Sequence, residues 1–504
     1  MSWNTLRGGL AAVIALAAGG ASADVTARQV WDDMRGYLEG MGYSVTASDS
    51  AAGDTLTVRD ISLARTLPDD EGSVDVTVPE IRFTENGDGT VSIRYPETLP
   101  VAISARPEDE PPADFRLDLT QSGLEIVVSG DPEDSLRYDY GAAQLGIALA
   151  DLVVDGQPVP PGDARAALTV AGLDGTATVG SGPLRAIEQS ASMERLDYDV
   201  DFVDPEGDDG RVTLKGSMNA VESRTSARIP ERAGLDDMAA ALDEGYALES
   251  SLSYSGGQAD FSAEEDGQTL TGSTRATQGG VALAIDAERL SYELTGEGTD
   301  VTLEGDELPF PVSFQMARTV MSFVVPLTPS DEPRAFSLGL TLGDFTMSDN
   351  LWNIFDPGAM LPRDPATLSL DVDGLARVLV SVFDPDVMES ADEPAQLEAL
   401  TLNSLELRAA GAELTGEGAF TFDNSDTATF NGMPHPTGSI DLRLAGANAL
   451  LDTLVSMGLL PEEQAMGARM MMSMFAVPAG DDVLRSNIAI NGEGQILANG
   501  QRIQ

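Results

Sequence analysis

The chain has 504 residues, 42% of them hydrophobic, which is enough for two to four domains or one elongated repetitive domain and argues against wholesale disorder. Its 83 acidic residues outnumber 29 lysines and arginines, and the net charge of -54 argues against binding to nucleic acid or to anionic lipid headgroups. The absence of cysteine excludes disulfides, thiol catalysis, cysteine-ligated zinc and a lipid-modified cysteine.

Residues 1–23 predict a cleaved secretory signal peptide. Arg7 is the only charge there, an apolar run occupies residues 10–18, and Ala21-Ser22-Ala23 offers the small residues that a signal peptidase requires. The run is shorter than the roughly 20 residues that cross a bilayer. We therefore expect a periplasmic protein that is not transmembrane once the signal is cleaved. An uncleaved leader that anchors the chain in the inner membrane is the alternative.

Residues 24–230 predict an N-terminal helix followed by a β-rich region. Apolar residues fall at helical spacing between Val30 and Met41, after which the period changes to two. A break in this alternation at Arg59-Asp60 predicts a β-bulge, and residues 86–89 (Asn-Gly-Asp-Gly) predict a hairpin turn. Residues 204–210 predict an acidic turn.

Residues 231–345 predict a second amphipathic helix, at Leu235–Leu242, and a β-meander. Glycine-rich turns are expected at residues 255–257 and 278–280. Strands are then expected to begin near Tyr246, Ala259, Gln268, Gly280, Leu290 and Val301, about ten to twelve residues apart. Apolar residues alternate with polar ones, so each strand should have one buried and one solvated face.

Residues 346–504 predict a C-terminal β region. A short helix is expected within residues 349–365, a helical pair at residues 446–475, and a last hairpin around residues 491–494. The whole chain therefore predicts a mainly β fold with peripheral helices near the N-terminus, the middle and the C-terminus. We expect elongated, curved antiparallel sheets over an apolar groove that the helices partly cover.

No catalytic residue, metal site or cofactor is predicted. His435 is the only histidine and lies in a turn-like Met-Pro-His-Pro segment, and no Gly-x-Ser-x-Gly motif accompanies it. Lys215, the only lysine, lies in an alternating strand and should be solvated. The acidic segments that begin at Asp204 and Asp371 lack the glycine or glutamate positions of a calcium loop. We expect a protein that is not an enzyme.

A group of methionines is the most suggestive apolar feature. Thioether side chains are flexible and recur on surfaces that bind varied apolar ligands. The residues of this predicted ligand-binding site are Met457, Met466, Met470, Met471 and Met474. The alternative is that their helices only cap the end of a sheet, and both interpretations can hold together.

Three C-terminal segments carry a resemblance to known proteins. They are residues 413–422 (Glu-Leu-Thr-Gly-Glu-Gly-Ala-Phe-Thr-Phe), 436–444 (Pro-Thr-Gly-Ser-Ile-Asp-Leu-Arg-Leu) and 488–502. They resemble the uncharacterised exported bacterial family called domain of unknown function 2125, over most of the chain. The C-terminal region is also distantly similar to AsmA-like envelope proteins.

The AsmA-like resemblance implies a long, curved antiparallel sheet with an apolar inner groove, and a role in lipid handling or outer-membrane assembly. AsmA-like proteins usually keep an N-terminal membrane anchor, whereas this leader is predicted to be cleaved, which argues against a bridge between two membranes.

The function we expect is therefore non-enzymatic: a periplasmic protein that binds or shields a lipid, acyl chain or other apolar ligand. The first alternative is a scaffold of the cell envelope that contacts other envelope proteins through its sheets. The second is a carboxylate-based hydrolase whose site cannot be located from the sequence.

Overall fold

The computed structural model describes residues 24–66, 72–106, 111–203, 210–230, 238–383, 391 and 393–503. Over these residues the fold is mainly β with peripheral helices, as predicted. The predicted signal peptide and most of the acidic turn at residues 204–210 lie outside them. The chain divides into two compact units, an N-terminal unit through Thr274 with Gly305–Glu307, and a C-terminal unit of Arg275–Glu304 and Leu308 onward. The domain boundaries predicted at residues 230 and 345 stay predictions.

The residues of the N-terminal unit that the structure describes form two helices and thirteen strands. The helices are α1 (Ala27–Gly40) and α2 (Met238–Asp243). The strands are β1 (Ser44–Ala52), β2 (Thr55–Thr66), β3 (Gly72–Glu85), β4 (Val91–Arg94), β5 (Thr98–Ala105), β6 (Ala113–Ser122), β7 (Glu125–Asp131), β8 (Ser135–Val154), β9 (Gln157–Pro158), β10 (Ala164–Gly180), β11 (Leu184–Val203), β12 (Arg211–Pro230) and β13 (Ala247–Glu265). The boundary between the units falls within β14 (Gln268–Ile285).

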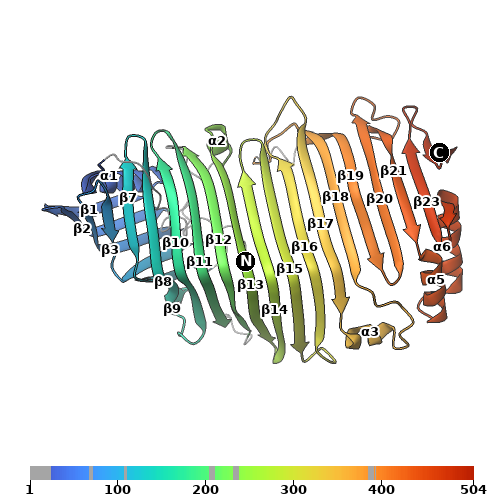
Figure 1. The fold of residues 1–504 in the computed structure, drawn as a ribbon, viewed down its shortest axis with the longest axis horizontal. Coiled ribbons are helices and arrows are strands. Elements are labelled where there is room, and N and C mark those ends of the chain that lie inside the picture. The colour runs from blue at the N-terminus through green and yellow to red at the C-terminus, as the bar shows by residue number, and fades with distance from the viewer. Residues whose placement is uncertain are drawn as a thin grey trace. The chain divides into compact units, whose positions relative to one another are not determined.

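In the first part of this unit, β3 and β8 each pair with two shorter strands. β3 pairs with β5 at one end and with β4 at the other, and β8 pairs in the same way with β6 and β7. Beyond β8, the long strands β10, β11, β12 and β13 follow as antiparallel neighbours. Helix α1 packs against β1, β2 and β3 (Figure 1).

Local chemistry explains where α1 forms. Thr26 and Gln29 make a capping box that satisfies backbone N–H groups at the first turn. Val30 and Trp31 on one face are buried in the core, where the Trp31 ring lies 6.1 Å from that of Phe83. The predicted N-terminal helix is confirmed, and the predicted bulge is found in β2, where Asp60 has a φ of 53°.

In the described part of the C-terminal unit there are three helices, together with the remaining strands. The helices are α3 (Asp349–Phe355), α5 (Ala447–Ser456) and α6 (Glu462–Phe475). The strands are β15 (Arg289–Gly305), β16 (Val312–Pro326), β17 (Arg334–Met347), β18 (Ala366–Val378), β19 (Ala395–Ala409), β20 (Ala412–Asp423), β21 (His435–Ala445), β22 (Val477–Gly480), β23 (Val483–Ile490), β24 (Ile496–Ala498) and β25 (Gln501–Arg502).

Strands β15 to β21 each pair antiparallel with the next in chain order, and β21 then pairs with β23 (Figure 1). Helices α5 and α6 pack against each other, and α5 also contacts β20. The short helix, the helical pair and the final hairpin are where the sequence predicts them.

The meander predicted for residues 246–345 is correct at three of its six strand starts, near Tyr246, Gln268 and Leu290. The starts predicted near Ala259, Gly280 and Val301 are wrong, because these residues lie inside longer strands. β13, β14 and β15 contain 19, 18 and 17 residues, and the glycines at residues 256–257 and 279–280 lie inside strands. Gly256 has a φ of 85°, a conformation that glycine adopts without steric cost. These glycines mark irregularities within long strands, and the chain reverses at later positions.

Residues with left-handed backbone lie at neighbouring positions in the N-terminal unit, namely Gly172 in β10, Ala220 in β12 and Gly256 in β13. Before each of these three residues, the apolar side chains of the strand are at even-numbered positions, and after it they are at odd-numbered positions. The pairing register of the strands is the same before and after these residues. The left-handed residue shifts the alternation within its own strand by one, so apolar side chains on both sides of it stay on one face.

Candidate functional site

An apolar cavity of about 280 Å³ lies under α1 in the N-terminal unit. Helix α1 forms one wall, and the opposite walls come from strands that are far apart in sequence. The lining residues are Trp31, Asp33, Met34, Tyr37, Leu38, Ile61, Leu63, Val76, Val78, Ile81, Tyr95, Pro96, Leu99, Val101, Leu119, Thr120, Gln121, Leu124, Ile126, Tyr138, Tyr140, Leu145, Gly146, Ile147, Leu168, Val170, Leu173, Val179, Arg185 and Ile187.

The left-handed backbone at Gly172 brings two stretches of β10 to this cavity. Leu168 and Val170 precede Gly172 and carry even numbers, whereas Leu173 and Val179 follow it and carry odd numbers. All four line the same cavity, which shows that the change of alternation keeps one strand face apolar along its length.

Asp33 and Arg185 are the charged side chains among the described residues that line the cavity. They form an ion pair between α1 and β11, with side chains that are only 17% and 16% exposed. Arg185 also donates from Nε to the carbonyl of Gly180 at 3.0 Å, and its guanidinium carbon lies 5.1 Å from the centre of the Tyr37 ring. Burial raises the pKa of the Asp33 carboxyl, and the charge of Arg185 opposes that shift.

Tyrosines supply further polar atoms at the cavity wall. Burial raises the pKa of Tyr95 and of Tyr138 far above the ordinary value, so both phenols remain neutral. The Tyr140 hydroxyl accepts a hydrogen bond of 2.9 Å from Gln189 Nε2. The cavity is thus a mostly apolar site with a few polar groups, as small-molecule pockets commonly are.

The apolar sheet face that lines the cavity continues across neighbouring strands of the same unit. One cross-strand row runs Leu99, Leu119, Ile147, Leu168, Tyr198, Gly216 and Ala259. Beyond the cavity, Phe202, Val212 and Leu214 lie on the same strand faces and are 38 to 56% exposed. Apolar side chains therefore continue from the cavity along β11 and β12.

The C-terminal unit has an apolar sheet face of its own. One row crosses eight strands as Tyr292, Phe323, Leu338, Val372, Leu402, Gly418, Ile440 and Ile488. Neighbouring rows are equally rich in leucine, and Met321, Leu338 and Leu407 on this face are 45 to 46% exposed. Contiguous apolar surface that remains exposed commonly marks an interaction site.

The predicted methionine site lies in the C-terminal unit. Met466, Met470, Met471 and Met474 project from α6 and are 61 to 64% exposed, while Met457 is half-buried at the end of α5. Arg469 ties α6 to α5 through Asp452 Oδ1 at 2.6 Å. The structure therefore brings the four α6 methionines together on a solvent-facing helix, and none of them lines the N-terminal cavity. Their role in ligand binding stays a prediction.

No local sequence pattern locates the N-terminal cavity. The apolar stripe of α1 was visible as a helical pattern, but helical periodicity does not say whether a helix covers a filled core or a cavity. Arg185 carries no sequence signal, because its partner Asp33 is 152 residues away.

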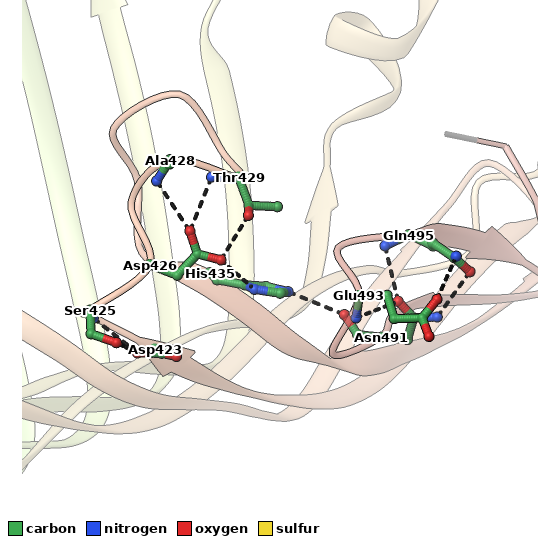
Figure 2. A network of polar contacts seen from close by, with 9 residues as sticks. All are labelled: Asp423, Ser425, Asp426, Ala428, Thr429, His435, Asn491, Glu493 and Gln495. Atoms are coloured by element: carbon green, nitrogen blue, oxygen red, sulfur yellow. Dashed lines mark hydrogen bonds and ion pairs between the residues drawn. The ribbon is translucent and has the colours of Figure 1, made fainter.

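His435 belongs to a network of polar contacts that joins two loops of the C-terminal unit (Figure 2). Its Nδ1 lies 3.1 Å from Asp426 Oδ2 and its Nε2 lies 3.2 Å from the carbonyl oxygen of Asn491. Hydrogen bonds from Thr429 hold the pKa of the Asp426 carboxyl below its usual range. The histidine is buried and both ring nitrogens are engaged, which is the arrangement of a structural side chain.

Within the described ranges, no group of three or more histidine, aspartate or glutamate side chains is placed to hold a metal ion. No helix of the same ranges combines the length and the apolar character of a membrane span.

Comparisons with known proteins give a family and distant structural likenesses. A family model described as an uncharacterised protein conserved in bacteria (DUF2125) matches residues 166–491. No curated protein matches the chain. The solved structures include BauA, the ferric preacinetobactin receptor from Acinetobacter baumannii, at 10% identity and a TM-score of 0.16, over 91% of this chain and 78% of that one. So low a score supports no functional argument.

Proposed function

The chain belongs to the uncharacterised bacterial family DUF2125, and on that premise we propose that it is a non-enzymatic protein that binds or shields an acyl chain or another apolar ligand. The observation that carries the proposal is the apolar cavity under α1. A cavity of about 280 Å³ lies near the lower end of the usual range for ligand pockets, about 300 to 1,000 Å³.

The exposed apolar faces add support. Residues 166–491, which the family model matches, include the C-terminal sheet face with its rows of leucine, phenylalanine and isoleucine. Leaving such a face in water is unfavourable by about 25 cal/mol for each Å² of apolar surface, so a ligand that covers it gains binding free energy. The predicted leader places this activity in the periplasm, which remains part of the proposal, as does the likeness to AsmA-like proteins.

Native mass spectrometry tests the proposal. The full chain would be exported to a bacterial periplasm, purified, and weighed before and after extraction with organic solvent. We expect bound acyl species that disappear on extraction. A clean apo mass, together with no lipid-dependent rise in melting temperature, would contradict ligand binding and favour the envelope scaffold.

A pair of variants in β10 locates the ligand. Val170→Asp places a charge in the cavity wall and should reduce the bound species, because burying an unpaired carboxylate is costly. Thr169→Asp, the adjacent residue on the other face of the strand, is the matched control and should keep them. Equal occupancy in both variants would exclude the cavity as the binding site.

The methionines of α6 are proposed as a second contact surface for the ligand. Met470→Gln and Met474→Gln should each reduce the bound acyl species, because they replace an exposed apolar side chain with a polar one. Ser473→Gln, on the same helix, serves as the control. Unchanged occupancy in both methionine variants would leave α6 with only a structural role.

A further inference from the structure

The charged pair at the cavity wall points to a ligand with a polar head. Asp33 and Arg185 face a cavity whose other described walls are mostly apolar. Arg185 uses Nε to bind the Gly180 carbonyl and Nη2 to bind Asp33, and its Nη1 makes no hydrogen bond with the described part of the chain. A donor therefore remains available beside an apolar cavity, and a carboxylate acceptor lies next to it.

We propose that Arg185 and Asp33 bind the head of a single-chain carboxylic acid whose alkyl tail fills the cavity. This inference rests on the proposed function and names the ligand class. The acid carbonyl oxygen accepts a hydrogen bond from Arg185 Nη1, and the acid O–H donates to the Asp33 carboxylate. The protonated acid leaves the net charge of the site unchanged, whereas an ionised acid would add a negative charge without a second cation.

The environment of Asp33 favours a shared proton. Burial is the largest influence on its carboxyl and raises its pKa, while Arg185 acts in the opposite direction. A second carboxyl group at this place strengthens the preference for one proton between the two acids. An acid that is ionised in solution must therefore take up a proton as it binds, and its affinity falls as the pH rises.

The other titratable groups around the pair do not compete for this proton. They are Tyr37 on α1, Tyr138 on β8, Tyr95 after β4 and Tyr246 after α2. Burial raises the pKa of all four above the ordinary value of tyrosine, so they stay neutral throughout the range in which carboxyl groups titrate.

The volume of the cavity favours a ligand with one alkyl chain. A cavity of about 280 Å³ is small for a lipid with two chains. A permanently charged phosphate head would also add negative charge beside the Asp33 carboxylate, and Arg185 is the one cation that lines the described cavity wall.

Titration of the lipid-extracted full chain with dodecanoic acid and with 1-dodecanol tests the inference, at about pH 4.5, where much of the free acid is protonated, and at about pH 7, where nearly all of it is ionised. At the lower pH we expect the acid to bind about tenfold more tightly than the alcohol, the difference that one charge-assisted hydrogen bond provides. The advantage of the acid should shrink at the higher pH, and the affinity for the alcohol should stay constant.

Variants of Asp33 and Arg185 test whether these two residues cause the preference for the acid over the alcohol. Arg185→Gln should abolish the preference for the acid and leave binding of the alcohol. Because that variant leaves Asp33 without its cation, the doubly neutral variant Asp33→Asn/Arg185→Gln is the safer form, and a melting curve checks that it folds. Arg137→Gln removes an arginine of β8 that pairs with Asp139 away from the cavity, so this control should keep the preference.

The outcomes separate the two proposals. Equal binding of acid and alcohol by the unmodified chain, or an acid preference that survives in the doubly neutral variant, would overturn this inference while leaving the proposed function intact. Binding of neither probe would overturn the proposed function itself.

Discussion

Single glycines make room for aromatic rings on the neighbouring strands of the sheets. A Cβ atom built at Gly374 would lie 2.2 Å from the Phe336 ring and 2.6 Å from the backbone oxygen of Ala399. Gly216 has the same relation to Tyr198, at 2.3 Å. Side-chain volume is therefore fixed at these positions by a neighbour that is distant in sequence, and local propensity has little part in it.

Gly374→Ala should lower the free energy of unfolding by about 1 to 3 kcal/mol, because the ring and the backbone must both shift. Gly492→Ala is a suitable control, since no atom lies within 4 Å of its built Cβ. Denaturant unfolding measures both. Equal stability of the two variants would show that the sheet relaxes around the added methyl group.

Asp356 anchors the turn after α3. Its buried carboxylate accepts the backbone N–H groups of Met360 at 2.9 Å and Leu361 at 3.0 Å. The hydrogen bond from Met360 is the main influence that holds the pKa of this carboxyl below its usual range. The unfolded chain binds the proton at the ordinary pKa, about 3.9, so the contribution to stability is complete above that pH and is lost as the pH falls through the folded value.

Asp356→Asn should therefore destabilise the chain at neutral pH more than at about pH 3, where the aspartate also loses its charge. Amide hydrogen exchange of Met360 and Leu361 reports the turn directly. A difference between variant and unmodified chain that is the same at both pH values would contradict this account.

Helix α1 supplies residues both to the hydrophobic core and to the cavity wall of the N-terminal unit. Trp31 is 3% exposed and packs on Phe83, whereas Arg35, one turn later at the edge of the apolar stripe, is exposed and pairs with Glu39. The helix also carries Asp33 to the cavity wall. Its buried and exposed residues therefore have separate roles in packing and in solubility, as the helical periodicity of the sequence indicates.

Trp31→Ala should cost about 3 to 5 kcal/mol through the cavity that it leaves. Arg35→Ala should change stability by no more than about 0.5 kcal/mol, the size of an exposed helical ion pair. Calorimetric unfolding compares the two. Similar melting temperatures would mean that α1 is not part of the cooperative core.

Net charge acts on the molecule as a whole. Eighty-three acidic residues against 29 basic ones leave a large excess of negative charge, and the ion pairs described here are mostly exposed. Repulsion among unpaired carboxylates favours the expanded chain, and salt screens it.

Raising sodium chloride from about 0.05 M to about 0.5 M should therefore increase the melting temperature at neutral pH. At about pH 4 the carboxylates begin to protonate, and the effect of salt should be smaller. A melting temperature that is independent of salt at neutral pH would show that self-repulsion has no measurable effect on stability.

The sequence by itself determined the β-rich class, the positions of α1, α3, α5, α6 and the last hairpin, and the family, because each depends on local periodicity or on a contiguous motif. Strand length in the middle of the chain was not predicted correctly. A glycine pair such as Gly256-Gly257 has the same local signature in a turn as at an irregularity inside a strand, and the pairing of β12 with β13 decides between them.

Only the tertiary structure decided where the apolar cavity lies. Its walls come from one helix and from strands spread between residues 61 and 187, and its charged pair joins Asp33 to Arg185 across 152 residues. Periodicity reports which face of an element is apolar, but two apolar faces can enclose either a filled core or a cavity. The difference is set by the curvature and register of pairings between distant strands, which no local pattern encodes.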